Sequence, residues 1–500
     1  MPDKDFLKPK MQNIFMKSYP VRNEVKDLEE RITIKSGIRK MGFAIGTQAL
    51  ILVCSLVTSL VVPKYMQKET YGYWQIYYFY LNYINFITFG YNDGTVLKYG
   101  GKKREDLPIE RIRRGNLLML LCSTMVAVCG IILLQILKLP VENRIIFTTL
   151  FASMPFVSIF NIISSLFLAI NQQEKYNVLN FVNRFVATVG YCVLLFVGMQ
   201  GYIPMIGIDY AVRVLIAVAC AAVGIYFWKG KKSSWREGWN EVRENCGGGI
   251  FITMGALLAS FAPLAGRVVL EHNATIEEYA LFSFAMSVLS LIVTFTNAAG
   301  VVFFPMLKKL DAKDMPKYYG KIKNVYNYLI YGALLCYVPV VLVIRFYLTE
   351  YMGVLGYVYL LVAICIPLGK MQILITPYMK AYRLEKEYFI ANLISAAVIW
   401  VCDSLVYRLT SSTLFLALTT FIVYELWSLG FELYLKKKIT LDKMEHWKEL
   451  VLALYFVLIA FSGRLTVFVI GYCCGAAALI VRNRKSLQKI FRRKYWLEER

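Results

Sequence analysis

The sequence predicts an all-α polytopic membrane protein of about fourteen transmembrane helices, arranged as two six-helix lobes followed by two C-terminal helices. Three observations predict this fold class. Hydrophobic residues make up 58% of the 500 residues and charged residues only 18%, against about 25% charged in soluble domains. Apolar stretches of about 20 residues, long enough to cross a hydrocarbon layer of roughly 30 Å, recur from Met41 to Val481. Basic residues gather in alternate loops.

Each apolar stretch is assigned one span. Residues 1–40 are polar and charged and lack the apolar segment and cleavage site of a signal peptide, so the first span, residues 41–62, is predicted to act as a signal anchor.

The last two spans are short and only three residues apart, so they form either a hairpin of full spans or a re-entrant pair. The spans after the first are predicted at residues 72–90, 116–137, 145–170, 177–198, 203–228, 249–270, 279–305, 324–347, 354–377, 387–408, 412–434, 449–462 and 465–481.

The distribution of Lys and Arg tests this arrangement, because a wrong number of spans would place basic loops on both sides. The predicted inner segments hold roughly 45 of the 56 basic residues, and the outer loops hold about six. Both termini are therefore predicted to lie in the cytoplasm. The inner segments are the N-terminal tail, residues 91–115, 171–176, 229–248, 306–323, 378–386 and 435–448, and the C-terminal tail.

The basic segment 229–248 divides the first twelve spans into six and six, so both halves start on the inner side. An even number of spans in each half gives parallel repeats, with a binding site expected between them near the middle of the membrane. The predicted organisation is a cytoplasmic tail (1–40), an N-lobe (41–228), a cytoplasmic linker (229–248), a C-lobe (249–434), two further helices (435–481) and a basic cytoplasmic tail (482–500).

Composition also excludes several classes of function. The net charge of +23 follows from the inner-loop bias and does not indicate nucleic-acid binding. Ten of the eleven cysteines lie in apolar spans, which excludes a disulfide framework. An enzyme is not expected, because outer loops are short, His272 and His446 are the only histidines, and no P-loop or HExxH motif occurs. No cofactor and no metal site are predicted.

Charged residues inside the spans are the candidates for function, since a charge in hydrocarbon is costly and usually faces a watery cavity or a partner. Arg213 is the deepest basic one, about 15 Å from the outer end of its span at 1.5 Å per residue. The in-span charges considered are Arg184, Asp209, Arg213, Arg267, Lys370, Asp403 and Glu425.

Each of these charges has a structural interpretation. Asp209 and Arg213 lie four residues apart on one helix face and can neutralise each other. Arg184 and Lys370 lie about seven residues from inner ends, and Arg267 lies close to an outer end, so all three can extend to the membrane surface.

The functional interpretation is a cationic cavity that binds an anionic substrate group, such as a diphosphate, by charge-assisted hydrogen bonds. The basic residues that would line it are Arg184, Arg213, Arg267 and Lys370. Acidic residues in spans are candidates for proton or cation coupling, with a helix–helix hydrogen bond as the alternative. These are Asp209, Asp403 and Glu425.

The second span is too polar and aromatic for a helix that faces only lipid. Gln75, Asn82 and Asn85 recur at i, i+7 and i+10, on one helical face. Amides flanked by aromatic rings suit the hydroxyls and apolar faces of sugars. An interfacial aromatic belt accounts for the tyrosines and tryptophan at the outer end but not for the deeper asparagines.

Two further places are predicted to be kinks or hinges: Pro367 with Gly369, and Gly247 to Gly249.

Two stretches resemble the polysaccharide biosynthesis flippases. The first runs through residues 69–75 (ETYGYWQ), 89–94 (FGYNDG) and 97–101 (LKYGG), and the second through residues 282–287 (FSFAMS) and 297–307 (NAAGVVFFPML). The matched stretches cover about a tenth of the chain. The resemblance implies the fold of the multidrug/oligosaccharidyl-lipid/polysaccharide transporters, a MATE-like pair of six-helix lobes that opens alternately to either side.

The resemblance also implies a function. The cargo would be an undecaprenyl-diphosphate-linked oligosaccharide repeat unit, moved from the inner to the outer leaflet of a bacterial cytoplasmic membrane for surface polysaccharide synthesis. The partners would be membrane lipid, this lipid-linked glycan, and a polysaccharide polymerase and glycosyltransferases. No short motif ties the cavity arginines to family positions. The alternative is a cation-coupled multidrug antiporter of the same fold, for which an acidic cavity would be more natural than a basic one.

Overall fold

The computed structural model describes residues 42–44, 46–228, 234–261, 264–307, 315–382, 384–439 and 446–482. The predicted N-terminal tail lies outside the described residues, as do residues 229–233 of the predicted linker and the C-terminal tail beyond Arg482. Every regular element in the described part is a helix.

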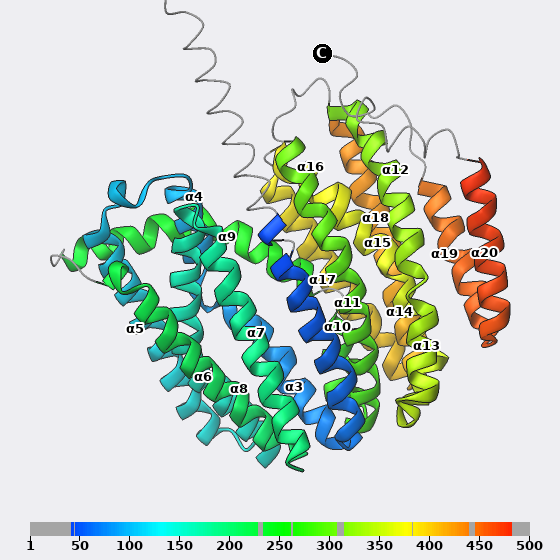
Figure 1. The fold of residues 1–500 in the computed structure, drawn as a ribbon, viewed down its shortest axis with the longest axis horizontal. Helices are drawn as coiled ribbons and strands as arrows, with labels where there is room; N and C mark the ends of the chain where they lie inside the picture. Colours follow the sequence, from blue (N-terminus) through cyan, green and yellow to red (C-terminus); the bar gives the residue numbers. More distant parts are fainter. Residues whose placement is uncertain are drawn as a thin grey trace, which may run out of the picture.

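The N-terminal half begins with an unlabelled helix, Gly42–Tyr65, drawn in dark blue in Figure 1. Its other elements are α3 (Lys68–Ile84), η1 (Asn85–Thr88), α4 (Tyr91–Tyr99), η2 (Arg104–Asp106), α5 (Ile109–Ile136), α6 (Val141–Ala169), α7 (Gln173–Phe196), α8 (Tyr202–Val223) and η3 (Ile225–Trp228).

The C-terminal half follows on from a long helix, α9 (Trp235–Phe261), and the shorter α10 (Ala265–Asn273). Its other elements are α11 (Ile276–Leu307), α12 (Met315–Leu334), α13 (Tyr337–Phe346), η5 (Thr349–Gly356), α14 (Val358–Ala363), α15 (Cys365–Lys370), the π-helical η6 (Met371–Ile375), α16 (Thr376–Ala381), α17 (Glu385–Thr410), α18 (Thr413–Ile439), α19 (His446–Phe461) and α20 (Leu465–Arg482).

Ten helical stretches in the described residues are long and apolar enough to cross a membrane, by length and composition. The four other predicted spans coincide with helices that are shorter or more polar: α3, α9 with α10, α19 and α20. The predicted fold class, an all-α polytopic membrane protein, is confirmed.

Burial separates lipid-facing helices from central ones. Only 28% of the most apolar stretch of α5 is buried, whereas 94% is buried in Val358–Ala381, which comprises α14, α15, η6 and α16. This stretch is therefore the centre of the C-terminal half, and α5 is an outer wall whose exposed Ile132 and Ile136 face lipid. The predicted kink at Pro367 and Gly369 falls in α15, between the break at Ile364 and the π-helical turn η6.

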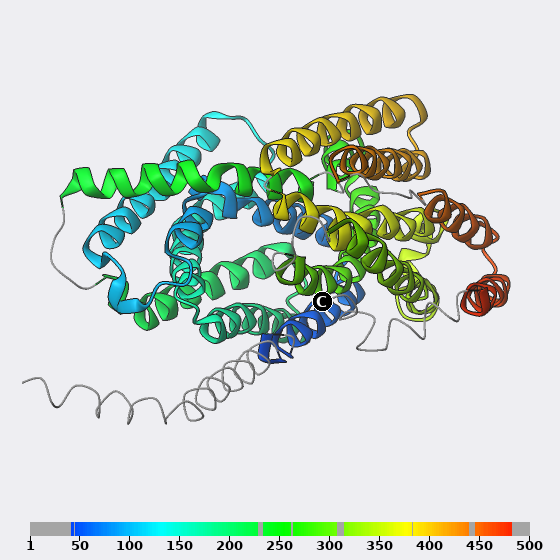
Figure 2. The same ribbon diagram turned by 90° about the horizontal axis from the view of Figure 1, so that it is seen from above.

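The two halves lie side by side, with α3 of the first half against α11 of the second (Figures 1 and 2). Gly72 permits this approach, because a Cβ atom there would lie 2.8 Å from the backbone oxygen of Ile276. The rings of Tyr71 and Tyr351 meet edge to face at 5.8 Å between centroids. The halves are therefore closed against each other at the end of the bundle away from α9.

Helix α9 lies across the opposite end of the bundle, its length visible in Figure 2, where the bundle is seen from above. It begins with a capping box in which Ser234 and Glu237 bond each other's backbone N–H groups, both at 3.2 Å. The helix then continues without a break through Gly247 to Gly249, where the sequence predicted the end of the linker and the start of the seventh span.

The seam between α4 and α9 explains why this helix lies where it does. A Cβ at Gly94 would fall 1.8 Å from the backbone oxygen of Asn245, and one at Gly249 would fall 2.0 Å from that of Gly90. Gly90 has a φ of +83°, a conformation that glycine adopts without strain. The backbones of α4 and α9 therefore touch, which only glycines at these positions allow.

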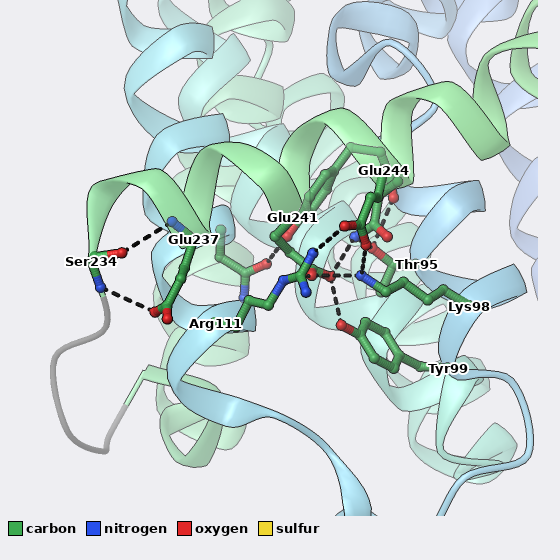
Figure 3. Close-up of polar contacts among 11 residues, drawn as sticks. Thr95, Lys98, Tyr99, Arg111, Ser234, Glu237, Glu241 and Glu244 are labelled. Atoms are coloured by element: carbon green, nitrogen blue, oxygen red, sulfur yellow. Dashed lines mark hydrogen bonds and ion pairs between the residues drawn. The ribbon is translucent and has the colours of Figure 1, made fainter.

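An ionic network around one buried carboxylate fastens the first half of α9 to α4 and α5 (Figure 3). Glu241, fully buried, accepts hydrogen bonds from Lys98 at 2.6 Å and Tyr99 at 2.7 Å, and pairs with Arg111 at 2.6 Å. The same two cations contact Glu244 at 2.8 and 2.6 Å, and they lower the pKa of Glu244 to about 2. Two acids and two bases thus balance, and α9 is anchored to the N-terminal half.

Candidate functional site

Arg267 is the centre of the candidate site. It lies on α10 beside α11, its side chain is 4% exposed, and its Nη2 donates to the backbone oxygen of Ser283 at 2.9 Å. Its Nε has no hydrogen-bond partner, and no carboxylate pairs with it within the described residues. Burying a charge without a counter-ion destabilises the folded protein by roughly several kcal/mol, even after the surrounding protein relaxes. The arrangement therefore favours an anion from outside the protein.

Tyrosines surround this guanidinium. Tyr71 and Tyr83 of α3 and Tyr279 of α11 are among its electrostatic neighbours. The hydroxyl of Tyr83 and the Oε1 of Gln75 are buried without a hydrogen-bond partner in the described part of the chain. Buried polar groups are normally paired, so these atoms make the contact between α3 and α10–α11 the candidate place for a polar ligand or for water. We call these residues, with Arg267, the interlobe cluster.

Glu271 lies one helical turn after Arg267 but does not neutralise it. Its Oε2 instead accepts a hydrogen bond from Tyr80 of α3 at 2.9 Å. This bond joins the two halves next to the interlobe cluster and leaves the positive charge uncompensated.

Arg184 extends the positive charge into the N-terminal half. Its Nη1 donates to the hydroxyl of Tyr78, and its guanidinium carbon lies 5.6 Å from the centroid of that ring. Trp74 stacks on the ring of Tyr78, with 5.4 Å between the two ring centroids. Tyr78 is also an electrostatic neighbour of Arg267, so the structure brings the predicted Arg184 and Arg267 into the neighbourhood of one tyrosine.

Arg213 and Asp209 form the pair that their spacing allowed. Arg213 Nε lies 2.6 Å from Asp209 Oδ2, and the carboxylate also accepts bonds from Tyr77 and Tyr191, each at 2.7 Å. Asp209 is therefore satisfied on both oxygens. Arg213 is still predicted to bind substrate, although Asp209 already compensates its charge.

Lys370 has different surroundings from the other predicted cations. It is fully buried and pairs with Glu432, and with Glu449 at 2.6 Å. Lys323 contacts the same two carboxylates, at 2.6 and 3.2 Å. We call these four residues the lysine–glutamate network. It joins α12, α15, α18 and α19 and carries no net charge, so its geometry favours a structural role for Lys370.

The predicted acidic residues of the C-terminal half lie on the neighbouring helices α17 and α18. Asp403 is fully buried, and the hydroxyl of Thr420 lies 3.0 and 3.2 Å from its two oxygens. Within the described residues no basic side chain pairs with Asp403. Glu425, on α18, is 6% exposed.

The predicted amide face of the second span is only partly brought to the site. Gln75 belongs to the interlobe cluster and donates to Tyr71 at 2.6 Å. Asn82 is exposed and donates to the backbone oxygen of Tyr78 at 2.8 Å. Asn85 begins η1, where α3 ends, and its side chain lies outside the description. The prediction of a single span to residue 90 is thus wrong: α3 ends at Ile84, the 3-10 helix η1 follows, and the positive φ of Phe89 and Gly90 ends η1 before α4 begins.

Several site residues were not predicted. Glu432 lies within a predicted span, so the criterion of charge inside a span would have found it. Lys323 and Glu449 lie at span ends, where charges are ordinary, and the tyrosines are indistinguishable in sequence from those of an interfacial belt. Only their contacts in the folded chain identify them.

No protein-family model matches the chain, and no curated protein matches it. Solved structures do. A lipid II flippase, MurJ, in an inward closed conformation matches with a TM-score of 0.58 and 14% identity, over 90% of this chain and 100% of that chain. Two multidrug resistance transporters of the MATE family of the MOP superfamily also match, each with 10% identity. The inward-facing one has a TM-score of 0.56 over 79% of this chain and 96% of its own, and the outward-facing one 0.54 over 81% and 95%. The chain therefore has the MATE-like fold that the sequence predicted.

Proposed function

We propose that the protein is a flippase of a bacterial cytoplasmic membrane, with both termini inside. It moves undecaprenyl-diphosphate-linked oligosaccharide repeat units from the inner to the outer leaflet by alternating access, for surface polysaccharide synthesis. The observation that carries the proposal is Arg267, a buried cation between the two halves that no acidic side chain of the described chain compensates. A non-enzymatic role agrees with the transporters and flippase that share the fold.

The diphosphate is proposed to bind Arg267 and Arg184, which have Tyr78 as a common neighbour. Two forked cations suit the geometry of adjacent phosphates. Arg213, held by Asp209, adds a positioned group at the side of the N-terminal half. The amide of Gln75 and, in another state of the transporter, those of Asn82 and Asn85 are proposed to contact sugar.

Reconstitution tests the proposal directly. The purified chain is placed in liposomes that contain a fluorescent undecaprenyl-diphosphate oligosaccharide, and exposure of the label to an outside reagent is followed with and without an ion gradient. Protein-dependent exposure is expected. Absence of exposure with several glycans, together with gradient-driven dye uptake, would establish the multidrug antiporter instead.

Asp403 is the observation that favours an ion-coupled mechanism for either cargo. A carboxylate buried in a membrane helix with a hydroxyl as its hydrogen-bonding partner, and no basic residue paired to it in the described part, is suited to bind a proton or a cation. We propose Asp403 as the coupling residue. Asp209 is already paired with Arg213 and suits this role less well, and Glu425 is retained as a second candidate.

The Asp403→Asn variant is expected to lose stimulation of transport by the gradient. A coupling free energy typical of linked sites corresponds to a loss of roughly 5- to 150-fold, because the amide keeps the shape but not the charge. The assay compares flipping rates with and without a proton or sodium gradient. Glu277→Gln, which changes an exposed carboxylate on α11, is the matched control. Undiminished stimulation in Asp403→Asn would transfer the role to Glu425.

A further inference from the structure

A cleft lies between α13, η5, α19 and α20, apart from the interlobe cluster. The cleft is small and partly open to the surroundings. Its lining is Tyr337, Val341, Arg345, Leu355, Ala460, Gly463, Arg464, Leu465 and Phe468. The walls are thus mainly apolar, and two arginines supply the charge.

The two arginines lie at the same edge of the cleft. Arg345 follows Tyr337 and Val341 at steps of four along one face of α13, and its Nη2 donates to the backbone oxygen of Gly463 at 2.7 Å. Arg464 is the next residue in the turn between α19 and α20. Neither arginine forms an ion pair within the described residues, so two positive charges converge without an anion from the protein.

The two arginines lie at an end of the bundle where basic residues are few. The cleft lies at the end of the bundle away from α9, where the sequence places only about six basic residues. Apolar side chains flank it on the outside of the molecule: Phe346 is 81% exposed, and Leu458 and Phe461 are each 70% exposed. A surface of this composition on helices at the periphery faces lipid acyl chains.

We infer that this cleft binds the phosphate of an anionic glycerophospholipid, in the leaflet at the end of the bundle away from α9. The phosphate accepts hydrogen bonds from Arg345 and Arg464, and the acyl chains of the lipid lie against the exposed Phe346, Leu458 and Phe461 beside the cleft. A lipid fits better than free phosphate, because apolar walls would leave free phosphate partly desolvated without a partner. The inference does not depend on the proposed cargo.

The test uses the full chain in nanodiscs made from equal parts of phosphatidylglycerol and phosphatidylcholine. Lipids that remain bound are identified by native mass spectrometry. The wild-type protein is expected to retain phosphatidylglycerol selectively. The double variant Arg345→Gln, Arg464→Gln is expected to lose this selectivity by roughly ten- to thirty-fold, given two cations each contributing at a membrane surface.

Two further variants guard the interpretation. Arg408→Gln removes an exposed arginine from the last turn of α17, which does not line the cleft, and it should keep full selectivity. Arg464→Gln alone removes no side-chain hydrogen bond of the described chain, so it tests the site without risk to folding. A partial loss of selectivity for phosphatidylglycerol is expected in this variant. Equal selectivity in wild type and double variant, or equal loss in Arg408→Gln, would overturn the site. Displacement of the bound lipid by millimolar inorganic phosphate would overturn the assignment to lipid.

Discussion

Flipping by the Arg267→Gln variant is expected to fall by roughly 30-fold or more, while its melting temperature stays unchanged or rises. Loss of a buried charge-assisted contact to an anion weakens binding by about 2–5 kcal/mol, and 1.4 kcal/mol is a factor of ten. The opposite sign for stability follows because Arg267 is buried with no counter-ion among the described residues, so its removal relieves a desolvation penalty. Flipping in liposomes and thermal unfolding in detergent measure the two effects.

Two variants control this experiment. Arg267→Lys keeps the charge but loses the planar fork, so an intermediate rate is expected if a diphosphate binds there. Arg408→Gln, an exposed arginine outside the site, should flip at the wild-type rate. A wild-type rate in Arg267→Gln, or a clear drop in its melting temperature, would show that Arg267 is a structural residue and not the diphosphate ligand.

The Glu432→Gln variant is expected to be destabilised by about 3–5 kcal/mol, the usual effect of removing one partner from a buried ion pair. Glu432 accepts from both Lys323 and Lys370, so its neutralisation leaves two buried ammonium groups with one carboxylate. Glutamine has nearly the same volume, so no cavity contributes. A lower melting temperature in detergent, with less folded protein in the membrane, is the expected measurement.

A second variant separates stability from transport in the lysine–glutamate network. Lys370→Met combined with Glu432→Gln removes one charge of each sign and leaves the Lys323–Glu449 pair at 3.2 Å, so most of the stability should return. If Lys370 is structural, as its contacts favour, this double variant flips at the wild-type rate. A stable but inactive double variant would instead support the prediction that Lys370 binds substrate.

The ion pairs show why sequence reasoning reached some residues and not others. Asp209 and Arg213 are four residues apart, and helical geometry alone predicts that they meet. Lys370 finds its partners on α18 and α19, 62 and 79 positions further along the chain. Its depth in a span was visible in the sequence, but whether it faces a cavity or a carboxylate depends on how four helices pack.

The glycines show the same division. The stretch FGYNDG was identified by resemblance, and no physical reason for its two glycines could be read from the sequence. In the structure they are the positions at which α4 touches α9, with a Cβ at Gly94 only 1.8 Å from a backbone oxygen. The same contact holds α9 across the bundle, where apolar length alone predicted a span that starts at residue 249.

By itself, then, the sequence determined the membrane class, most of the helical spans and which loops are basic, because each rests on local composition and on the length needed to cross a bilayer. The packing of the two halves decided which in-span charges are compensated. Among the described residues, Arg213 and Lys370 have counter-ions and Arg267 has none. Charge compensation depends on distances of a few ångströms between residues far apart in sequence, and those distances exist only once the helices have packed.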